Sequence, residues 1–212
     1  MPSRNTVIFA AACVGIALAL LVTALIAMGG RERVGSGDVI ASTGEAAIGG
    51  PFSLIDQTGA AVDQSILEGR WTLVFFGFTY CPDFCPGTLQ LLDATRRELG
   101  AAGDDIQILF ITVDPARDTP QALADYLSSP DFPPNVIGLT GSDEQIAAAA
   151  QAYRAVYSRA ETPGGYTMNH TLTVYLMNPE GRFQSALAHG LSPRDAAGVI
   201  RRAMASHETA SR

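Results

Sequence analysis

Lysine is absent from this chain of 212 residues, and cysteine occurs only three times. All fourteen cationic side chains are arginine, and acidic residues outnumber them to give a formal net charge of −7. Proteins bind phosphate backbones with clustered cations, which this sequence does not have, so a role on nucleic acid is excluded. The sequence also shows no internal repeat.

Charged residues are missing from residues 6–28. The apolar run 7–28 is long enough to cross a bilayer core of about 30 Å. It also exceeds the roughly 7 to 15 apolar residues of a cleavable signal peptide. We therefore expect residues 1–29 to form an N-terminal transmembrane helix, while a small-residue site at residues 27–29 leaves signal cleavage open. Cationic residues flank both ends, so charge counting does not decide the orientation.

Composition divides the rest of the chain into three parts. Residues 30–50 are rich in Gly, Ser, Thr and Ala without periodicity, which is typical of a flexible linker. Residues 51–207 have the size of one domain and can bury a core without disulfides. Residues 208–212 form a short tail. Cys13 lies in the apolar segment, where we interpret it as a small apolar filler.

The other two cysteines lie in the motif Cys81-Pro-Asp-Phe-Cys85-Pro86. An apolar, aromatic-rich run at residues 71–78 precedes the motif and predicts a buried strand. From Thr88 onward, leucines recur at helical spacing, so the thiols lie between a strand and a helix. The N-terminus of a helix stabilises a thiolate, because its free N–H groups and dipole carry positive charge.

The spacing of the two cysteines favours metal binding over dithiol exchange. Thioredoxin-type oxidoreductases use Cys-x-x-Cys, whereas three residues separate Cys81 from Cys85. If both were helical, their Cβ atoms would lie roughly 5 to 6 Å apart, beyond the ~3.8 Å of a relaxed disulfide. A metal can bridge that distance. Because Pro82 prevents a regular helix through the motif, a disulfide stays open as an alternative, as do two inert structural cysteines.

The remaining elements alternate between strands and helices, which predicts an α/β, thioredoxin-like fold with a mixed sheet flanked by helices. Asp118 is interpreted as the N-cap of the helix after the second strand. The expected strands are an opening hairpin at 52–62, strands at 71–78, 106–113, 136–139 and 171–177, and a closing hairpin strand at 182–187. The expected helices are one that begins at residue 88 and three more at 118–127, 142–153 and 192–206.

A third candidate ligand is His170, at the end of a predicted loop over residues 164–170. In thioredoxin-like proteins this loop faces the cysteines and carries a cis-proline, but no proline occurs here between Gly164 and Asn178. Two thiolates and one imidazole would form a three-coordinate site that suits Cu(I) and accepts Cu(II) with a further ligand. Zinc would require a fourth ligand or a water.

Three other candidate ligands are left out of the predicted site. Met168 is two residues from His170, and we expect it to point elsewhere. His189 and His207 are expected to be exposed, on segments that do not reach the cysteines.

Together these motifs resemble the Sco/SenC family over about residues 49–204. The resemblance is carried by the cysteine motif, by Phe110-Ile-Thr-Val-Asp-Pro-Ala-Arg-Asp-Thr-Pro120, and by Tyr166-Thr-Met-Asn-His170. Members of that family are thioredoxin-fold copper chaperones for the copper A centre of cytochrome c oxidase. The resemblance implies copper as the metal, with Cys81, Cys85 and His170 as its ligands. It also implies a single-pass anchor in the inner membrane, with the domain facing the periplasm. Thr171 stands where many members have serine, and it keeps the hydroxyl.

The expected function is redox-gated copper delivery. Metal binding needs deprotonated thiols and a neutral imidazole, so the reduced pair holds copper and a Cys81–Cys85 disulfide does not. The implied partners are the copper-A-bearing oxidase subunit, an upstream copper donor and a thioredoxin-like reductant. Asp114 has two open roles, a turn former or a carboxylate near the metal loop.

Two other functions stay open from the sequence. The first is a membrane-anchored thiol-disulfide oxidoreductase that reduces the cysteines of the copper-accepting subunit, or a related peroxide-consuming enzyme. The second is a sensor of copper or redox state. A dithiol enzyme should tolerate the loss of the His170 imidazole, whereas a copper carrier should not.

Overall fold

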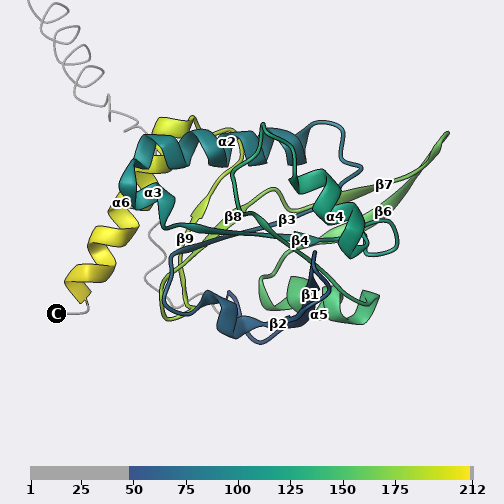
Figure 1. The fold of residues 1–212 in the computed structure, drawn as a ribbon, viewed down its shortest axis with the longest axis horizontal. Coiled ribbons are helices and arrows are strands. Elements are labelled where there is room, and N and C mark those ends of the chain that lie inside the picture. Colours follow the sequence, from purple (N-terminus) through teal and green to yellow (C-terminus); the bar gives the residue numbers. More distant parts are fainter. Residues whose placement is uncertain (1–47, 211–212) are drawn as a thin grey trace, which may run out of the picture. The chain divides into compact units, whose positions relative to one another are not determined.

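The computed structural model describes residues 48–210, which form a seven-stranded mixed sheet with helices on both sides (Figure 1). Its strands are β1 (Ser53–Asp56), β2 (Ala61–Asp63), β3 (Thr72–Gly77), β4 (Gln107–Thr112), β5 (Ile137–Thr140), β8 (Val174–Met177) and β9 (Phe183–Leu187). They lie in the order β2-β1-β5-β4-β3-β8-β9. The three central strands β3, β4 and β5 are parallel, and β1 and β8 are antiparallel to their neighbours. This arrangement agrees with the α/β fold predicted from the sequence.

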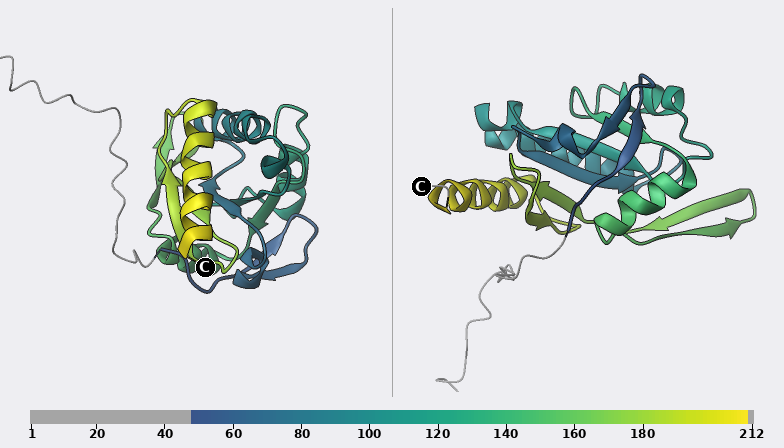
Figure 2. Two further views of the ribbon diagram at one scale, coloured as in Figure 1. Left: turned by 90° about the vertical axis from the view of Figure 1, so that its left-hand side faces the viewer. Right: turned by 90° about the horizontal axis from the view of Figure 1, so that it is seen from below.

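The helices cover this sheet from two sides. They are η1 (Gln64–Leu67), α2 (Phe84–Leu99), α3 (Ala101–Asp104), α4 (Pro120–Leu127), α5 (Asp143–Ala152) and α6 (Pro193–Ala210). Helices α2 and α6 pack against each other, and α6 also contacts β9. Figures 1 and 2 show α2 and α5 on opposite sides of the central strands.

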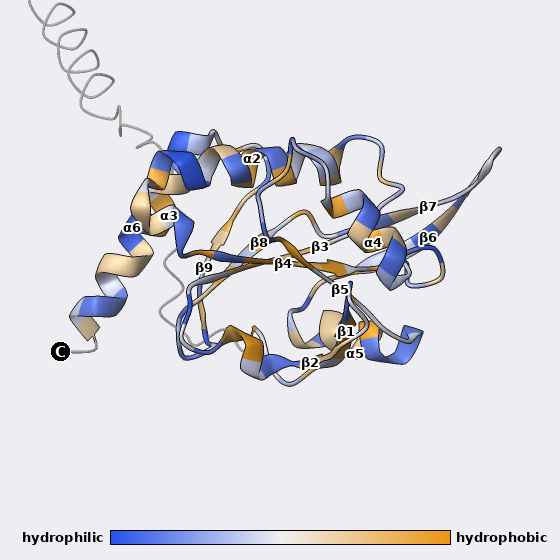
Figure 3. Ribbon diagram, in the orientation of Figure 1, coloured by the Kyte–Doolittle hydropathy of each residue, from blue (hydrophilic) through white to orange (hydrophobic). Residues whose placement is uncertain are grey.

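The centre of the core is formed by β3 and β4, which Figure 3 shows as mostly hydrophobic. All residues of β3 are buried, as are all but the first of β4. Parallel strands that are covered on both faces have continuous apolar sequences, without the alternation of apolar and polar residues seen in strands with one exposed face. The rings of Phe75 and Phe110 meet edge to face across the pair, with centroids 5.8 Å apart. Strand β3 ends at Gly77, and the loop that follows it leads to the cysteine motif.

A second, two-stranded sheet was not predicted. It is the hairpin of β6 (Tyr157–Thr162) and β7 (Gly165–His170), which extends away from the main sheet (Figures 1 and 2). The prediction of a loop at residues 164–170 is therefore wrong, because residues 165–170 form strand β7. The next strand begins at Val174 rather than at 171, since the intervening residues lead from the hairpin to the main sheet.

Three helix boundaries differ from the prediction. Helix α2 starts at Phe84, because the ring of Pro86 fits in a first turn, where backbone N–H groups have no helical partner. The interpretation of Asp118 as an N-cap is wrong: Thr119 caps α4, accepting a hydrogen bond from the Ala122 N–H. Helix α6 continues to Ala210, past its expected end at 206 and into the segment predicted as a tail.

The predicted anchor at residues 1–29 and nearly all of the linker at 30–50 lie outside the described residues. Among residues 48–210, no helix combines the length and apolar character needed to span a membrane.

Candidate metal site

Cys81 and Cys85 lie at the junction of β3 and α2. Cys81 belongs to the loop before the helix, and Cys85 is in its first turn. The N-cap residue Asp83 makes no side-chain capping bond. Instead, the Cys85 N–H donates to the Cys81 sulfur at 3.3 Å. The sulfur thus takes the place of the usual oxygen cap, where the positive end of the helix dipole favours an anion.

This environment divides the two thiols into a nucleophilic one and a protonated one. Hydrogen bonds from the Cys85 thiol and the Cys85 N–H, opposed by burial, lower the pKa of Cys81 to about 5. The same hydrogen bond and deeper burial raise the pKa of Cys85, whose side chain must keep its proton to donate it. Neither cysteine is in a disulfide. The site therefore holds one thiolate and one thiol at neutral pH.

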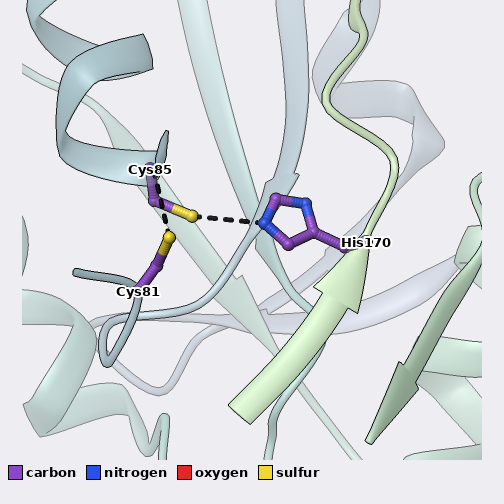
Figure 4. A group of neighbouring side chains, drawn as sticks. All are labelled: Cys81, Cys85 and His170. Carbon is purple, nitrogen blue, oxygen red and sulfur yellow. Dashed lines mark hydrogen bonds between the residues drawn. The ribbon is translucent and has the colours of Figure 1, made fainter. Parts of the chain in front are cut away.

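His170 ends strand β7 and faces the cysteines (Figure 4). Its Nδ1 lies 3.0 Å from the Thr171 carbonyl oxygen, which can only accept, so Nδ1 carries the hydrogen. In the neutral imidazole the lone pair is then on the other ring nitrogen, Nε2, which lies 3.5 Å from Cys85 Sγ. The imidazole is held edge to face by Phe75 and Phe78, with centroids 6.0 and 5.7 Å away.

The structure brings the three predicted residues together: their two sulfurs and one imidazole nitrogen lie within 4.8 Å of one another. Two sulfur atoms and a nitrogen form a soft donor set, the kind that suits Cu(I). A cavity of about 340 Å³ borders the cluster and is lined by Cys81 and His170. One side of the donor set thus opens toward solvent.

Gly77, the last residue of β3, makes room for the Cys85 side chain. A Cβ atom at this position would lie 2.9 Å from Cys85 Sγ and 2.7 Å from Cε2 of Phe110. Contacts that short do not occur between native side chains. The sulfur therefore occupies a position that a side chain at residue 77 would block.

Asp118 fixes the start of the cysteine loop. Its buried carboxylate accepts hydrogen bonds from the Thr79 N–H at 3.0 Å, the Thr79 hydroxyl at 2.6 Å and the Thr112 hydroxyl at 2.6 Å. Burial raises the pKa of Asp118, and these three donors oppose the shift. The residue connects the ends of β3 and β4 to the loop, which explains why it is not a helix cap.

Asp114 is also buried, and its carboxylate forms an ion pair with Arg117 and accepts a hydrogen bond from the Tyr166 hydroxyl at 2.9 Å. Its carbonyl oxygen accepts from the N–H groups of Arg117 and Asp118, so it also closes a turn. Asp114 is not among the three grouped metal-binding side chains. Sequence reasoning did not single out Arg117 or Tyr166, although both belong to the quoted motifs.

The three side chains left out of the predicted site lie in different surroundings. Met168 lines the same cavity as His170, so the expectation that it points elsewhere is wrong. The cause is that alternate residues of a strand share a face. His189 is exposed as expected, but its ring meets that of Phe84, the first residue of α2, with centroids 5.3 Å apart. His207 is not exposed: its side chain is 15% accessible, meets Trp71 edge to face and lies 3.3 Å from Glu180 Oε2.

Comparison with known proteins gives consistent matches. Residues 40–205 match the SCO1/SenC family. Protein SCO1 homolog 1, mitochondrial, of Arabidopsis thaliana is 45% identical over 144 residues, which cover 67% of this chain and 42% of that protein. The chain therefore spans less than half the length of this relative.

Two solved structures share the fold. Bradyrhizobium japonicum ScoI with copper bound is 43% identical, with a TM-score of 0.66, and the match covers 73% of this chain and 98% of that one. BsSco, a member of the Sco family of cytochrome c oxidase assembly proteins, is 24% identical, with a TM-score of 0.55 and coverage of 73% and 91%. The extent of the family match and the arrangement of the cysteines and the histidine lead to one conclusion: this chain belongs to the SCO1/SenC family.

Proposed function

We propose that the protein carries copper, bound by Cys81, Cys85 and His170. The observation that supports this most directly is the approach of three soft donor atoms, contributed by segments 85 residues apart, to within 4.8 Å. The contact of Nδ1 with the Thr171 carbonyl oxygen favours the tautomer in which Nε2 can bind a metal. A homologous ScoI from Bradyrhizobium japonicum is solved with copper bound.

The acceptor in this proposal is the copper A centre of cytochrome c oxidase, on the subunit that bears it. BsSco belongs to a family of assembly proteins for that oxidase. The open side of the cluster allows incoming ligands to replace the resident ones one at a time. Tyr80 and Phe84, on either side of Cys81, are 65% and 51% exposed, and large exposed apolar side chains at such a point suit a transient partner.

Loading and release depend on the oxidation state of the cysteines. The thiols are both free in the structure, and only this dithiol form offers two thiolate ligands. A thioredoxin-like reductant would keep it so in a compartment that favours disulfides, and an upstream donor would supply the copper. The apolar run at residues 7–28 supports a single-pass anchor in the inner membrane, with the domain in the periplasm.

The test is the amount of copper bound per chain by the full-length protein in detergent, reduced and anaerobic. A Cys13→Ser background removes the only other thiol. We expect the wild type to retain one equivalent through gel filtration, and Cys81→Ser and His170→Ala, which each keep only two of the three donors, to retain none. His189→Ala is the matched control, because that imidazole is exposed and bonded to neither sulfur, and it should retain the full equivalent. Binding that survives His170→Ala would contradict the proposal.

Thiol-disulfide exchange is the second candidate function. It is favoured by the low pKa of Cys81, which supplies a nucleophilic thiolate beside a second thiol. Turnover of a disulfide-bonded peptide derived from the copper-accepting subunit distinguishes the two. An oxidoreductase retains its turnover in His170→Ala, while a copper carrier shows little turnover even in the wild type.

A further inference from the structure

Arg117 lies in the loop between β4 and α4, and its guanidinium contacts three separate segments. Its Nε forms an ion pair with Asp114 in the same loop. Its Nη1 donates to the Tyr166 carbonyl oxygen on β7 at 3.0 Å. Its Cζ lies 3.8 Å from the centroid of the Tyr166 ring and 4.5 Å from that of Tyr80. One planar cation is thus placed between the cysteine loop and the β6–β7 hairpin.

Both segments carry residues of the metal site. Tyr80 directly precedes Cys81. Tyr166 and His170 belong to the same strand, and because they are four residues apart they share its face. A shift of Tyr166 relative to Tyr80 would therefore move the imidazole relative to the sulfurs.

Besides the contacts with Arg117 and Asp114, the His170 ring of the hairpin meets the rings of Phe75 and Phe78, and Tyr157 and Met168 pack against the edge of the core. Within residues 48–210, strand β7 pairs only with β6, and neither belongs to the seven-stranded sheet. An isolated two-stranded hairpin is marginally stable by itself. Three further hydrogen bonds join its ends, between Thr171 and Val156, but these link the hairpin to itself. Of these contacts, those of Arg117 join the hairpin directly to Tyr80 in the cysteine loop.

We propose that Arg117 is a positioning residue that holds His170 at binding distance from the two cysteines. The proposal rests on the copper-binding function proposed above. A guanidinium is suited to this position because it can stack on aromatic faces while it donates in its own plane. The buried Asp114 carboxylate pairs with Arg117 and also accepts a hydrogen bond from the Tyr166 hydroxyl. Tyr166 is therefore held through both its backbone carbonyl and its side chain.

One feature argues against a purely stabilising role. The Nη2 atom of Arg117 is buried and has no hydrogen-bond partner among residues 48–210. Burying an unsatisfied donor costs stability, so an apolar side chain would serve a packing role better. The arginine is better explained by the geometry that it imposes.

A double-mutant cycle on Cu(I) affinity tests the proposal, measured by competition with a chromogenic Cu(I) chelator on the full-length protein. Loss of an outer partner of a metal ligand typically weakens binding about 10- to 100-fold, and we expect this for Arg117→Ala. In a His170→Ala background the same substitution should change affinity by no more than about twofold. Equal losses in both backgrounds, or no loss in either, would overturn the proposal.

Two further variants separate geometry from charge. Arg117→Lys keeps the charge but cannot stack and donate together, so it should behave like Arg117→Ala. Wild-type affinity in Arg117→Lys would show that only charge matters and would overturn the proposal. Arg159→Ala is the matched control: Arg159 stacks on the same Tyr166 ring at 3.7 Å, but it pairs with Glu161. This control should stay within about twofold of the wild type.

A measurement on the metal-free protein makes the two proposals separable. Hydrogen–deuterium exchange of the amides in residues 157–170 should quicken in Arg117→Ala and Arg117→Lys, with the amides of β3 and β4 unchanged. If the wild type binds no copper, the proposed function fails, and the exchange result alone decides whether Arg117 positions the hairpin. Unchanged exchange in the hairpin would overturn the proposed role of Arg117.

Discussion

Replacing Gly77 by alanine should damage the metal site without touching any ligand. The new methyl group would lie 2.9 Å from Cys85 Sγ and 2.7 Å from Cε2 of Phe110. Neither neighbour can move freely, because Cys85 is fixed in the first turn of α2 and Phe110 is fully buried in the core. The strand, the helix or both must therefore shift.

The cost follows from the known effects of overpacking. Inserting a methyl group into a filled core costs about 1–3 kcal/mol. For a chain of this size, that lowers Tm by about 2–12 °C. Displacement of the Cys85 sulfur should also weaken Cu(I) binding by about tenfold or more. Circular dichroism melts and chelator competition measure the two effects.

Gly87→Ala provides the matched control. Gly87 is exposed in the same helix, two residues after Cys85, and nothing lies within 4 Å of a Cβ built on it. This substitution should leave copper affinity unchanged and raise stability by about 0.5–1 kcal/mol. If Gly77→Ala melts and binds copper like the wild type, the argument that Gly77 makes room for the sulfur is refuted.

Three other predictions follow from buried polar groups. Hydrogen bonds from Cys85 lower the pKa of Cys81 to about 5, so the stability gained from the Cys81 thiolate is full above the pKa of an ordinary thiol and is lost as the pH falls through about 5. The ultraviolet absorbance of the thiolate should follow this titration, and its midpoint should rise in Cys85→Ala. An unchanged midpoint would show that Cys85 does not lower the pKa of Cys81. Asp118→Ala should cost about 1–3 kcal/mol in urea unfolding, because three donors lose their acceptor, whereas Asp118→Asn keeps an acceptor for the Thr79 N–H and should cost less; equal losses would argue against the hydrogen bonds. Tyr153→Phe should raise stability by about 1 kcal/mol, because that hydroxyl is buried with no hydrogen-bond partner in the described part of the chain, and a clear loss of stability would show that the hydroxyl is satisfied in solution.

The sequence predicted the central elements well because burial leaves a clear pattern there. The apolar runs at residues 71–78 and 106–113 correspond to β3 and β4, which are covered on both faces. The hairpin of β6 and β7 was missed for the opposite reason. Most of β6 is exposed, so no alternation of apolar and polar residues reveals it.

For the site, the sequence indicated which residues converge but not what supports them. Cysteine spacing and the histidine before a strand were enough to propose the cluster that the structure brings together, while their role as ligands stays a prediction. Asp118 was misassigned because Thr119 beside it is an equally good cap. The contacts of Arg117 join segments 37 and 49 residues away, at Tyr80 and Tyr166, and local pattern does not encode contacts at that distance.

The burial of Cys85 in the core bears on whether the protein can bind and release copper repeatedly. Its side chain is fully buried against β3 and belongs to the hydrophobic core, which contains dozens of other side chains. In a zinc finger the metal supplies the folding free energy, and the empty chain unfolds. Here most of the core side chains are not candidate metal ligands, so we expect the fold to be stable without the metal and the emptied protein to be refillable. We therefore expect chelation to leave the melting of β3 and β4 nearly intact, as a reusable carrier requires.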